Sequence, residues 1–179
     1  MRKLLICIPL FFFTIISFAQ QRQAETQNVL LKIGDGLPDV TLKTMKDEDF
    51  NLKTELTNQP TIIIFYRANW CPYCMTHLSD LQDYEKQYIK LGYKIIAISS
   101  ESPENLSVTK SKAFARYTLL SDEDKVAIKA FGVENGNVAV PSVFIVNKDG
   151  VIKYVHSDPN YKERLSGAEV YHFAKEALK

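Results

Sequence analysis

The sequence has 179 residues, of which 46% are hydrophobic and 24% are charged, a composition typical of a globular protein and unlike that of disordered or collagen-like chains. Its 22 lysines and arginines nearly balance 21 aspartates and glutamates, so the chain lacks the basic excess that nucleic-acid binding requires. Three cysteines are too few for a disulfide-stapled scaffold. We therefore expect one ordinary folded domain with no nucleic-acid partner.

The first 19 residues have the pattern of a secretory signal peptide. Arg2 and Lys3 precede an apolar run over residues 4–18, and Ala19 ends a segment of the kind that a signal peptidase cleaves. The run is shorter than the roughly 20 residues that span a bilayer, so the pattern favours cleavage over a membrane anchor. We expect an exported protein without membrane attachment, located in the periplasm of a Gram-negative bacterium.

The segment after the expected cleavage site is polar. Residues 20–28 lack an apolar period and predict a flexible tether, so the domain is expected over residues 29–179. Cleavage after Ala19 removes Cys7 and two basic residues, which leaves 20 basic and 21 acidic residues. In an oxidising compartment the two remaining cysteines, Cys71 and Cys74, then have only each other as disulfide partners.

Strand and helix patterns alternate from the start of the domain. Short β segments at 40–42 and 50–52, on either side of the polar turn 46–49, predict an N-terminal hairpin. The continuous β-branched and aromatic run 61–66 predicts a strand that is buried on both faces. The apolar stripe that follows predicts a helix over residues 72–91.

The rest of the chain continues the alternation. Further strands are expected at 94–99, 118–120, 142–146 and 151–155, the last two joined as a hairpin by the turn 147–150. Further helices are expected over 103–115, 121–132 and from residue 166 to the C-terminus. Ser121 and Ser166 are each followed three residues later by an acid, which is typical of a helix start. The pattern predicts an α/β fold with a central mixed sheet and helices on both faces.

The cysteine motif lies where the 61–66 strand leads into the next helix. Residues 71–74 read Cys-Pro-Tyr-Cys, so Cys71 is expected at a helix N-terminus, where free N–H groups and the helix dipole favour a thiolate. Cys74 lies one helical turn further on, close enough to form a disulfide with Cys71. We expect Cys71 to be an exposed nucleophile and Cys74 to be the shielded, resolving thiol.

Two structural interpretations of the cysteine pair remain open. Cys71, Cys74 and His77 have a spacing that could supply three zinc ligands, but a closed structural site needs four and the mature chain has no second cysteine pair. A purely structural disulfide over so short a loop would remove little chain entropy. Redox chemistry without a metal or another cofactor is therefore the favoured interpretation.

Several segments together carry a family resemblance. The segments are Gly36–Leu42, Phe65–Cys74, Leu119–Asp122, Ala130–Val133, and Val140 with Pro141 ahead of the 142–146 strand. Over residues 33–173 the chain resembles the thioredoxin-fold redoxins of the alkyl hydroperoxide reductase and thiol-specific antioxidant superfamily. The resemblance implies a thioredoxin-like fold, and it implies that Pro141 follows a cis peptide bond beside the disulfide. It also implies that the Val140 main chain pairs with a docked substrate.

Departures from that family pattern narrow the expected activity. Typical peroxiredoxins carry Thr or Ser three residues before the reactive cysteine and Pro seven residues before it, where this chain has Ala68 and Ile64. Thioredoxin carries an acid six residues before its first cysteine, where this chain has Phe65. Trp70, directly before Cys71, is similar to the tryptophan of thioredoxin and of exported thioredoxin-like reductases.

The favoured function is therefore an exported thiol:disulfide oxidoreductase with weak peroxidase activity. The alternative is a thiol-dependent peroxidase in which Cys71 becomes a sulfenic acid that Cys74 condenses with. A non-catalytic interaction module is the second alternative, because a scaffold does not fix function. The expected partners are protein or small-molecule disulfides or hydroperoxides, together with an upstream thiol electron donor.

Three other side chains near the motif have two interpretations each. Arg67 is either a solvated loop arginine or a donor to the thiolate or peroxide, and it is the candidate to replace the hydroxyl missing at Ala68. Trp70 either docks substrate or covers the disulfide. His77 is either a proton relay or a partly exposed helical histidine, the second being favoured.

Overall fold

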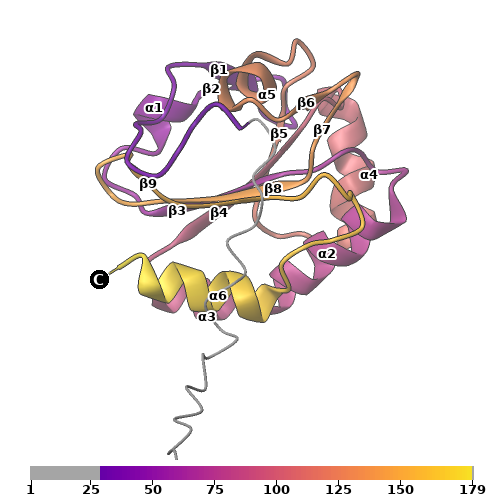
Figure 1. The fold of residues 1–179 in the computed structure, drawn as a ribbon. Coiled ribbons are helices and arrows are strands. Elements are labelled where there is room, and N and C mark those ends of the chain that lie inside the picture. The colour runs from indigo at the N-terminus through magenta and orange to yellow at the C-terminus, as the bar shows by residue number, and fades with distance from the viewer. Residues whose placement is uncertain (1–28, 179) are drawn as a thin grey trace, which may run out of the picture.

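Helices lie on both faces of a central β-sheet in the computed structural model, which describes residues 29–178 (Figure 1). The predicted signal peptide, the predicted tether and the last residue lie outside this range. Between residues 29 and 178 no helix combines the length and the apolar character needed to cross a membrane.

The strands and helices alternate much as the sequence pattern predicts. The strands are β1 (Thr41–Lys43), β2 (Asp49–Asn51), β3 (Thr61–Phe65), β4 (Lys94–Ser99), β5 (Thr118–Ser121), β6 (Glu134–Asn135), β7 (Val138–Ala139), β8 (Ser142–Val146) and β9 (Ile152–Ser157). The helices are α1 (Leu52–Glu55), α2 (Pro72–Asp83), α3 (Glu85–Lys90), α4 (Pro103–Ala113), α5 (Val126–Phe131) and α6 (Gly167–Glu176). Seven strands form one sheet in the order β2-β1-β5-β4-β3-β8-β9, and β6 pairs with β7.

Strand β3 occupies the interior of this sheet. It pairs in parallel with β4 and antiparallel with β8, so the sheet is mixed, and all five of its residues are buried. Ile62 and Ile64 face the core on the side of α2 and α6, whereas Ile63 and Phe65 face the core on the side of α1 and α5. Each such side chain contributes about 1.5–3 kcal/mol when fully buried, which explains the unbroken apolar run. The structure confirms the predicted fold class.

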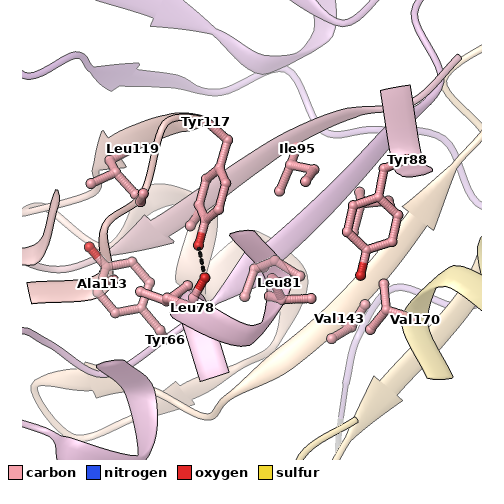
Figure 2. Packing of buried hydrophobic residues seen from close by; sticks show 14 of the residues in the cluster. Tyr66, Leu78, Leu81, Tyr88, Ile95, Ala113, Tyr117, Leu119, Val143 and Val170 are labelled. Carbon is pink, nitrogen blue, oxygen red and sulfur yellow. Dashed lines mark hydrogen bonds between the residues drawn. The ribbon is translucent and has the colours of Figure 1, made fainter. Parts of the chain in front are cut away.

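Buried tyrosines hold the helices in place on one side of the sheet (Figure 2). The hydroxyl of Tyr117, next to β5, donates to the carbonyl oxygen of Leu78 in α2 at 2.8 Å. The hydroxyl of Tyr88 in α3 donates to the carbonyl oxygen of Gly167 at 2.8 Å. These bonds satisfy polar atoms inside an apolar cluster. The first fixes α2 relative to the sheet, and the second fixes the start of α6 relative to α3.

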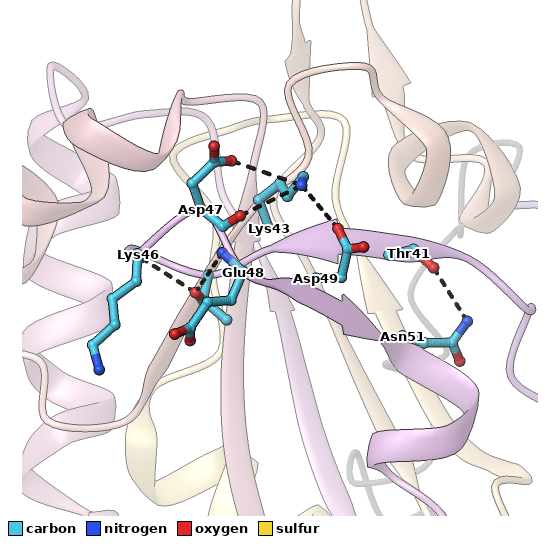
Figure 3. A network of polar contacts seen from close by, with 8 residues as sticks. Thr41, Lys43, Lys46, Asp47, Glu48, Asp49 and Asn51 are labelled. Atoms are coloured by element: carbon cyan, nitrogen blue, oxygen red, sulfur yellow. Dashed lines mark hydrogen bonds and ion pairs between the residues drawn. The ribbon is translucent and has the colours of Figure 1, made fainter.

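The predicted N-terminal hairpin is confirmed. Strands β1 and β2 pair antiparallel, with Leu42 opposite Phe50, and polar side chains surround their turn (Figure 3). Lys43 Nζ lies 2.8 Å from a carboxylate oxygen of Asp49 and 3.9 Å from one of Asp47. Such exposed ion pairs contribute little stability, so the buried faces of Leu42 and Phe50 hold the hairpin in place.

Two helix predictions were wrong in their bounds. The expected helix 72–91 is divided at Tyr84, the C-cap residue of α2 and the N-cap residue of α3. The expected start at Ser121 is also wrong, because Ser121 ends β5 and pairs with Ser99. Helix α5 instead begins at Val126, and the buried carboxylate of Asp122 accepts a hydrogen bond from the Ile128 N–H at 2.7 Å.

Candidate active site

Cys71 is the N-cap residue of α2, as the sequence predicts. Its backbone is extended, with φ −88° and ψ 107°, and its Sγ accepts a hydrogen bond from the Cys74 N–H at 3.3 Å. Pro72 occupies the first turn, where a missing N–H costs nothing. The sulfur therefore lies at the positive end of the helix, which stabilises a thiolate.

Both sulfurs are buried, and the expectation that Cys71 is exposed was wrong. Cys71 is 2% exposed and Cys74 is fully buried. Both belong to the apolar cluster that includes Tyr66 and Leu165. A position at a helix start does not reveal what covers it, and here a segment nearly 100 residues later in the chain contributes to the cover. Access of other molecules to these sulfurs is therefore restricted.

Arg164 is the functional residue that the sequence did not reveal. It precedes α6, and its Nη2 lies 3.4 Å from Cys74 Sγ and 3.9 Å from Cys71 Sγ. Its Nε and Nη1 are buried without a hydrogen-bond partner. A permanently charged guanidinium beside two sulfurs stabilises negative charge on either of them. No sequence motif marks this arginine, since it is 93 residues from Cys71.

The environment makes Cys74 a poor nucleophile at rest. Burial, followed by the hydrogen bond with Cys71, raises the pKa of the Cys74 thiol to about 11, although the charge of Arg164 opposes the shift. Cys74 therefore keeps its proton near neutral pH. That Cys71 reacts first and Cys74 follows stays a prediction.

His77 is buried, so the expectation of a partly exposed histidine was wrong. It is 7% exposed, and neither ring nitrogen has a hydrogen-bond partner. Burial, followed by the charge of Arg164, lowers the pKa of His77 to about 3. His77 is consequently neutral at physiological pH and adds no positive charge beside the thiols.

A buried carboxylate fixes the loop that leads to Cys71. Glu101 is 6% exposed and accepts hydrogen bonds from the Asn69 N–H at 2.9 Å, the Thr109 hydroxyl at 2.8 Å and the Ser99 hydroxyl at 3.1 Å. Lys112 Nζ donates to the Asn69 carbonyl oxygen at 3.1 Å. Both polar groups of the Asn69 backbone are thus bound, which holds the residues next to Cys71 in one conformation.

Arg67 packs among exposed aromatic rings. Its guanidinium carbon lies 4.8 Å from the centre of the Trp70 ring and 4.6 Å from that of Tyr161, within the range of a cation–π contact. Trp70 is 56% exposed, so it presents its ring to the surface. The arginine that contacts the sulfurs is Arg164, which corrects the expectation that Arg67 is the candidate donor.

The cis expectation at Pro141 was wrong, since every peptide bond in residues 29–178 is trans. The preceding main chain is also occupied within the fold. The Val140 N–H donates to the Val133 carbonyl oxygen at 2.7 Å, and the Val140 carbonyl oxygen accepts from the Ser142 hydroxyl at 2.9 Å. These bonds leave little backbone capacity at Val140 for the substrate pairing that the resemblance implies.

The zinc interpretation gains no support from the geometry. Within the part of the chain that the structure describes, no three or more histidine, cysteine, aspartate or glutamate side chains converge as a metal site would require. Cys71, Cys74 and His77 are thus not arranged as a ligand set, although they share one helix.

The chain is similar to peroxiredoxins. It is 31% identical over 136 residues to peroxiredoxin Bcp of Escherichia coli K12, a match that covers 72% of this chain and 86% of Bcp. It is 26% identical over 164 residues to the chloroplastic peroxiredoxin Q of Triticum aestivum, covering 89% and 75% of the two chains. These similarities extend across most of the described domain.

Solved peroxiredoxin structures share the fold. A PrxQ mutant from Xylella fastidiosa gives a TM-score of 0.73 at 20% identity, covering 83% of this chain and 98% of that chain. Peroxidoxin BcpB from Mycobacterium tuberculosis gives 0.69 at 22% identity, covering 83% and 94%. The AhpC/TSA family model matches residues 33–155, a range that contains both thiols and ends before Arg164. The chain therefore belongs to the AhpC/TSA family, and it is an enzyme of the thiol-dependent oxidoreductase class.

Proposed function

We propose that this protein is a thiol-dependent peroxidase. The Cys71 thiolate attacks one oxygen of a hydroperoxide, an S–O bond forms, the O–O bond breaks, and the leaving oxygen takes a proton to become water or an alcohol. Cys74 then attacks the sulfur of the Cys71 sulfenic acid, which releases water and forms the Cys71–Cys74 disulfide. Two electrons pass from the two thiols to the peroxide.

The observation that carries this proposal is the position of Arg164. Peroxide cleavage needs a donor that stabilises charge on the departing oxygen, and Ala68 has no hydroxyl to offer. The Arg164 Nη2 lies within 4 Å of both sulfurs, and the guanidinium has further N–H groups without partners. A peroxide at Cys71 would therefore meet a cationic donor.

Burial of the sulfurs also favours a small oxidant over a folded protein. Cys71 and Cys74 are 2% and 0% exposed, so hydrogen peroxide or a small organic hydroperoxide reaches them more easily than a protein disulfide does. The similarity to proteins named peroxiredoxins supports the same choice. On these grounds the peroxidase alternative replaces the thiol:disulfide oxidoreductase as the favoured function.

Stopped-flow oxidation of the reduced protein tests the proposal. Trp70, the only tryptophan in the chain, lies directly before Cys71 and provides a fluorescence signal. We expect hydrogen peroxide to oxidise Cys71 with a rate constant of at least about 10⁵ M⁻¹s⁻¹, within the range of efficient enzymes. A smaller rate constant with both hydrogen peroxide and an alkyl hydroperoxide would overturn the assignment.

Protein disulfide exchange is the second candidate. The observation in its favour is the pair of exposed rings around the motif, since Trp70 is 56% exposed and Tyr73 is 45% exposed. Such rings are typical of protein docking surfaces. Reduction of insulin disulfides at a rate above that of hydrogen peroxide would favour this candidate.

We also propose that the protein is exported to the periplasm of a Gram-negative bacterium. The support is the sequence pattern alone, with Arg2 and Lys3 ahead of the apolar run 4–18. Expression of the full chain in a Gram-negative host should yield a periplasmic protein whose N-terminus is Gln20. A cytosolic product that retains residues 1–19 would contradict export.

A further inference from the structure

A cavity of about 570 Å³ lies next to the cysteine pair, since Pro72 and Arg164 are among its lining residues. One wall is the face of α2 that carries Tyr73, Thr76 and His77, and the opposite wall is the segment with Lys162 and Arg164. Arg164 lines the cavity and also contacts both sulfurs. The cavity and the cysteine pair thus share one guanidinium, so a molecule in the cavity would lie next to the group that contacts both sulfurs.

The charge in this cavity is positive. Lys162 and Arg164 are its two cations, and Asp80 is its one carboxylate among the lining residues. Asp80 accepts a hydrogen bond from the Gly167 N–H at the start of α6, which offsets part of its charge. His77 is neutral at physiological pH because burial lowers its pKa to about 3.

The walls suit an organic molecule with a charged end. The Tyr73 ring packs edge-on against Tyr161, with ring centres 5.9 Å apart. Lys162 Nζ lies 5.8 Å from the centre of the Tyr73 ring and 5.9 Å from that of Tyr161. The ammonium group therefore stands over an aromatic surface at the cavity rim, where a carboxylate can meet a cation while carbon atoms contact the rings.

We propose that this cavity binds a low-molecular-weight thiol bearing a carboxylate, and that this thiol is the reductant that recycles the enzyme. The proposal rests on the proposed function, because peroxide reduction leaves the Cys71–Cys74 disulfide that the thiol must reduce. The buried sulfurs explain the choice of a small donor. Cys71 is 2% exposed, so a small thiol reaches it more easily than the cysteine of a folded protein does.

The reduction balances as two exchange steps. The thiolate attacks Cys71 Sγ, a mixed disulfide forms, the Cys71–Cys74 bond breaks, and Cys74 leaves as a thiolate beside Arg164, 3.4 Å away in the reduced enzyme. Cys74 then takes a proton, as its raised pKa requires. A second thiolate attacks the donor sulfur of the mixed disulfide and releases the Cys71 thiolate. Two donor thiols become one disulfide, and the enzyme gains two electrons.

A series of small thiols that differ in charge tests the proposal. The protein is oxidised with diamide, and its reduction is followed by Trp70 fluorescence with 3-mercaptopropionate, 2-mercaptoethanol and cysteamine, which are anionic, neutral and cationic. Each rate constant is divided by that of the same thiol with 2-hydroxyethyl disulfide, which corrects for intrinsic reactivity. We expect 3-mercaptopropionate to exceed cysteamine by about 10-fold or more, as clefts of one charge raise association rates.

Charge reversal at the cavity rim provides the matched variant. Lys162→Glu should abolish or invert the order of the three thiols, whereas Lys53→Glu, an exposed position in α1 on the other side of the sheet, should preserve it. Equal normalised rates for the three thiols in the unmodified protein would overturn the proposal, as would equal effects of the two variants. Because diamide forms the disulfide, slow oxidation by hydrogen peroxide would reject the peroxidase function without affecting this measurement.

Discussion

Glu101 accepts a hydrogen bond from the Asn69 N–H at 2.9 Å, although the two residues lie 32 positions apart. Glu101 is 6% exposed and also accepts hydrogen bonds from two hydroxyl groups. A carboxylate of this kind is stable inside a protein because several donors surround it. The bond connects the loop before Cys71 to the segment that follows β4.

Removal of this carboxylate should weaken the fold and the site together. Glu101→Ala leaves the Asn69 N–H and two hydroxyl groups without their acceptor, so we expect the free energy of unfolding to fall by about 1–3 kcal/mol in urea titrations. Peroxide oxidation should slow as the loop loses its fixed conformation. Glu104→Ala, an exposed position in the first turn of α4, should change stability by less than about 0.5 kcal/mol. Equal effects of the two variants would contradict this role of Glu101.

Arg164→Gln should slow oxidation of Cys71 by hydrogen peroxide by about 10² to 10³. A charged donor aimed at developing negative charge contributes roughly 2.7–4 kcal/mol to such a step, and glutamine has no charge. The matched control is Arg116→Gln, because Arg116 pairs at the surface with Glu85 at 3.2 Å, and it should stay within about twofold of the unmodified protein. Stopped-flow fluorescence measures both variants. Retention of the full rate in Arg164→Gln would remove Arg164 from the mechanism.

Cys74→Ser and Cys71→Ser should give different outcomes with hydrogen peroxide. Cys74→Ser should accumulate a sulfenic acid on Cys71, because the resolving thiol is gone, and Cys71→Ser should consume almost no peroxide. In the unmodified protein, alkylation at pH 6–7 should label Cys71 first, since burial raises the pKa of Cys74 to about 11. Mass spectrometry of peptides identifies the labelled residue. Preferential labelling of Cys74 would reverse the assignment of the nucleophile.

Buried His77 should make the protein less stable in acid. Burial and Arg164 lower its pKa to about 3, against an ordinary value of 6.5. Between these values the unfolded chain binds a proton at His77 that the folded chain does not. Stability therefore falls with decreasing pH, by at most about 1.4 kcal/mol per pH unit from this group. Urea titrations from pH 4 to 7 should show a shallower decline in His77→Gln, whereas His172→Gln, at an exposed position in α6, should retain the full decline.

Gly167→Ala should displace the start of α6. An added Cβ would lie 2.6 Å from Tyr84 Cδ2 and 2.9 Å from the Asp80 carbonyl oxygen, which is too close for either contact. We expect a loss of about 1–3 kcal/mol in stability, with slower peroxide oxidation because Arg164 precedes this position by three residues. Gly36→Ala meets no atom within 4 Å and should be close to neutral. Thermal unfolding measures the change in stability, and stopped-flow fluorescence measures the rate of peroxide oxidation. An unchanged oxidation rate in a folded Gly167→Ala protein would show that the start of α6 does not influence the site.

Periodic local patterns explain most of what the sequence could predict. The unbroken run in β3, the hairpin β8–β9 and the capping box at Ser166 all depend on neighbours within a few residues. The position of Cys71 at the start of α2 was also predicted from a local pattern, because a strand, a loop and an apolar helix follow one another in the sequence. Strands as short as β6 and β7 carry no period, and they were not predicted.

The predictions that were wrong concern features that depend on contacts between residues far apart in the sequence. His77 lines one cavity with Lys162, Arg164 and Leu165, and the charge at the sulfurs comes from Arg164. The cis expectation at Pro141 came from a family resemblance. The bonds that Val140 makes with Val133 and Ser142 could not be predicted from that resemblance. Sequence patterns located the thiols, whereas tertiary structure supplies the groups that control them.

The separation of 93 positions between Cys71 and Arg164 also means that the two residues are synthesised at different times. A growing chain that has emerged as far as Ser157 already holds the seven strands of the central sheet and both thiols, but it lacks Arg164, whose guanidinium contacts the sulfurs. The nascent enzyme therefore passes through a stage in which its sulfurs are open to solvent and to other thiols. Control over the cysteine pair is established only when the last helix docks.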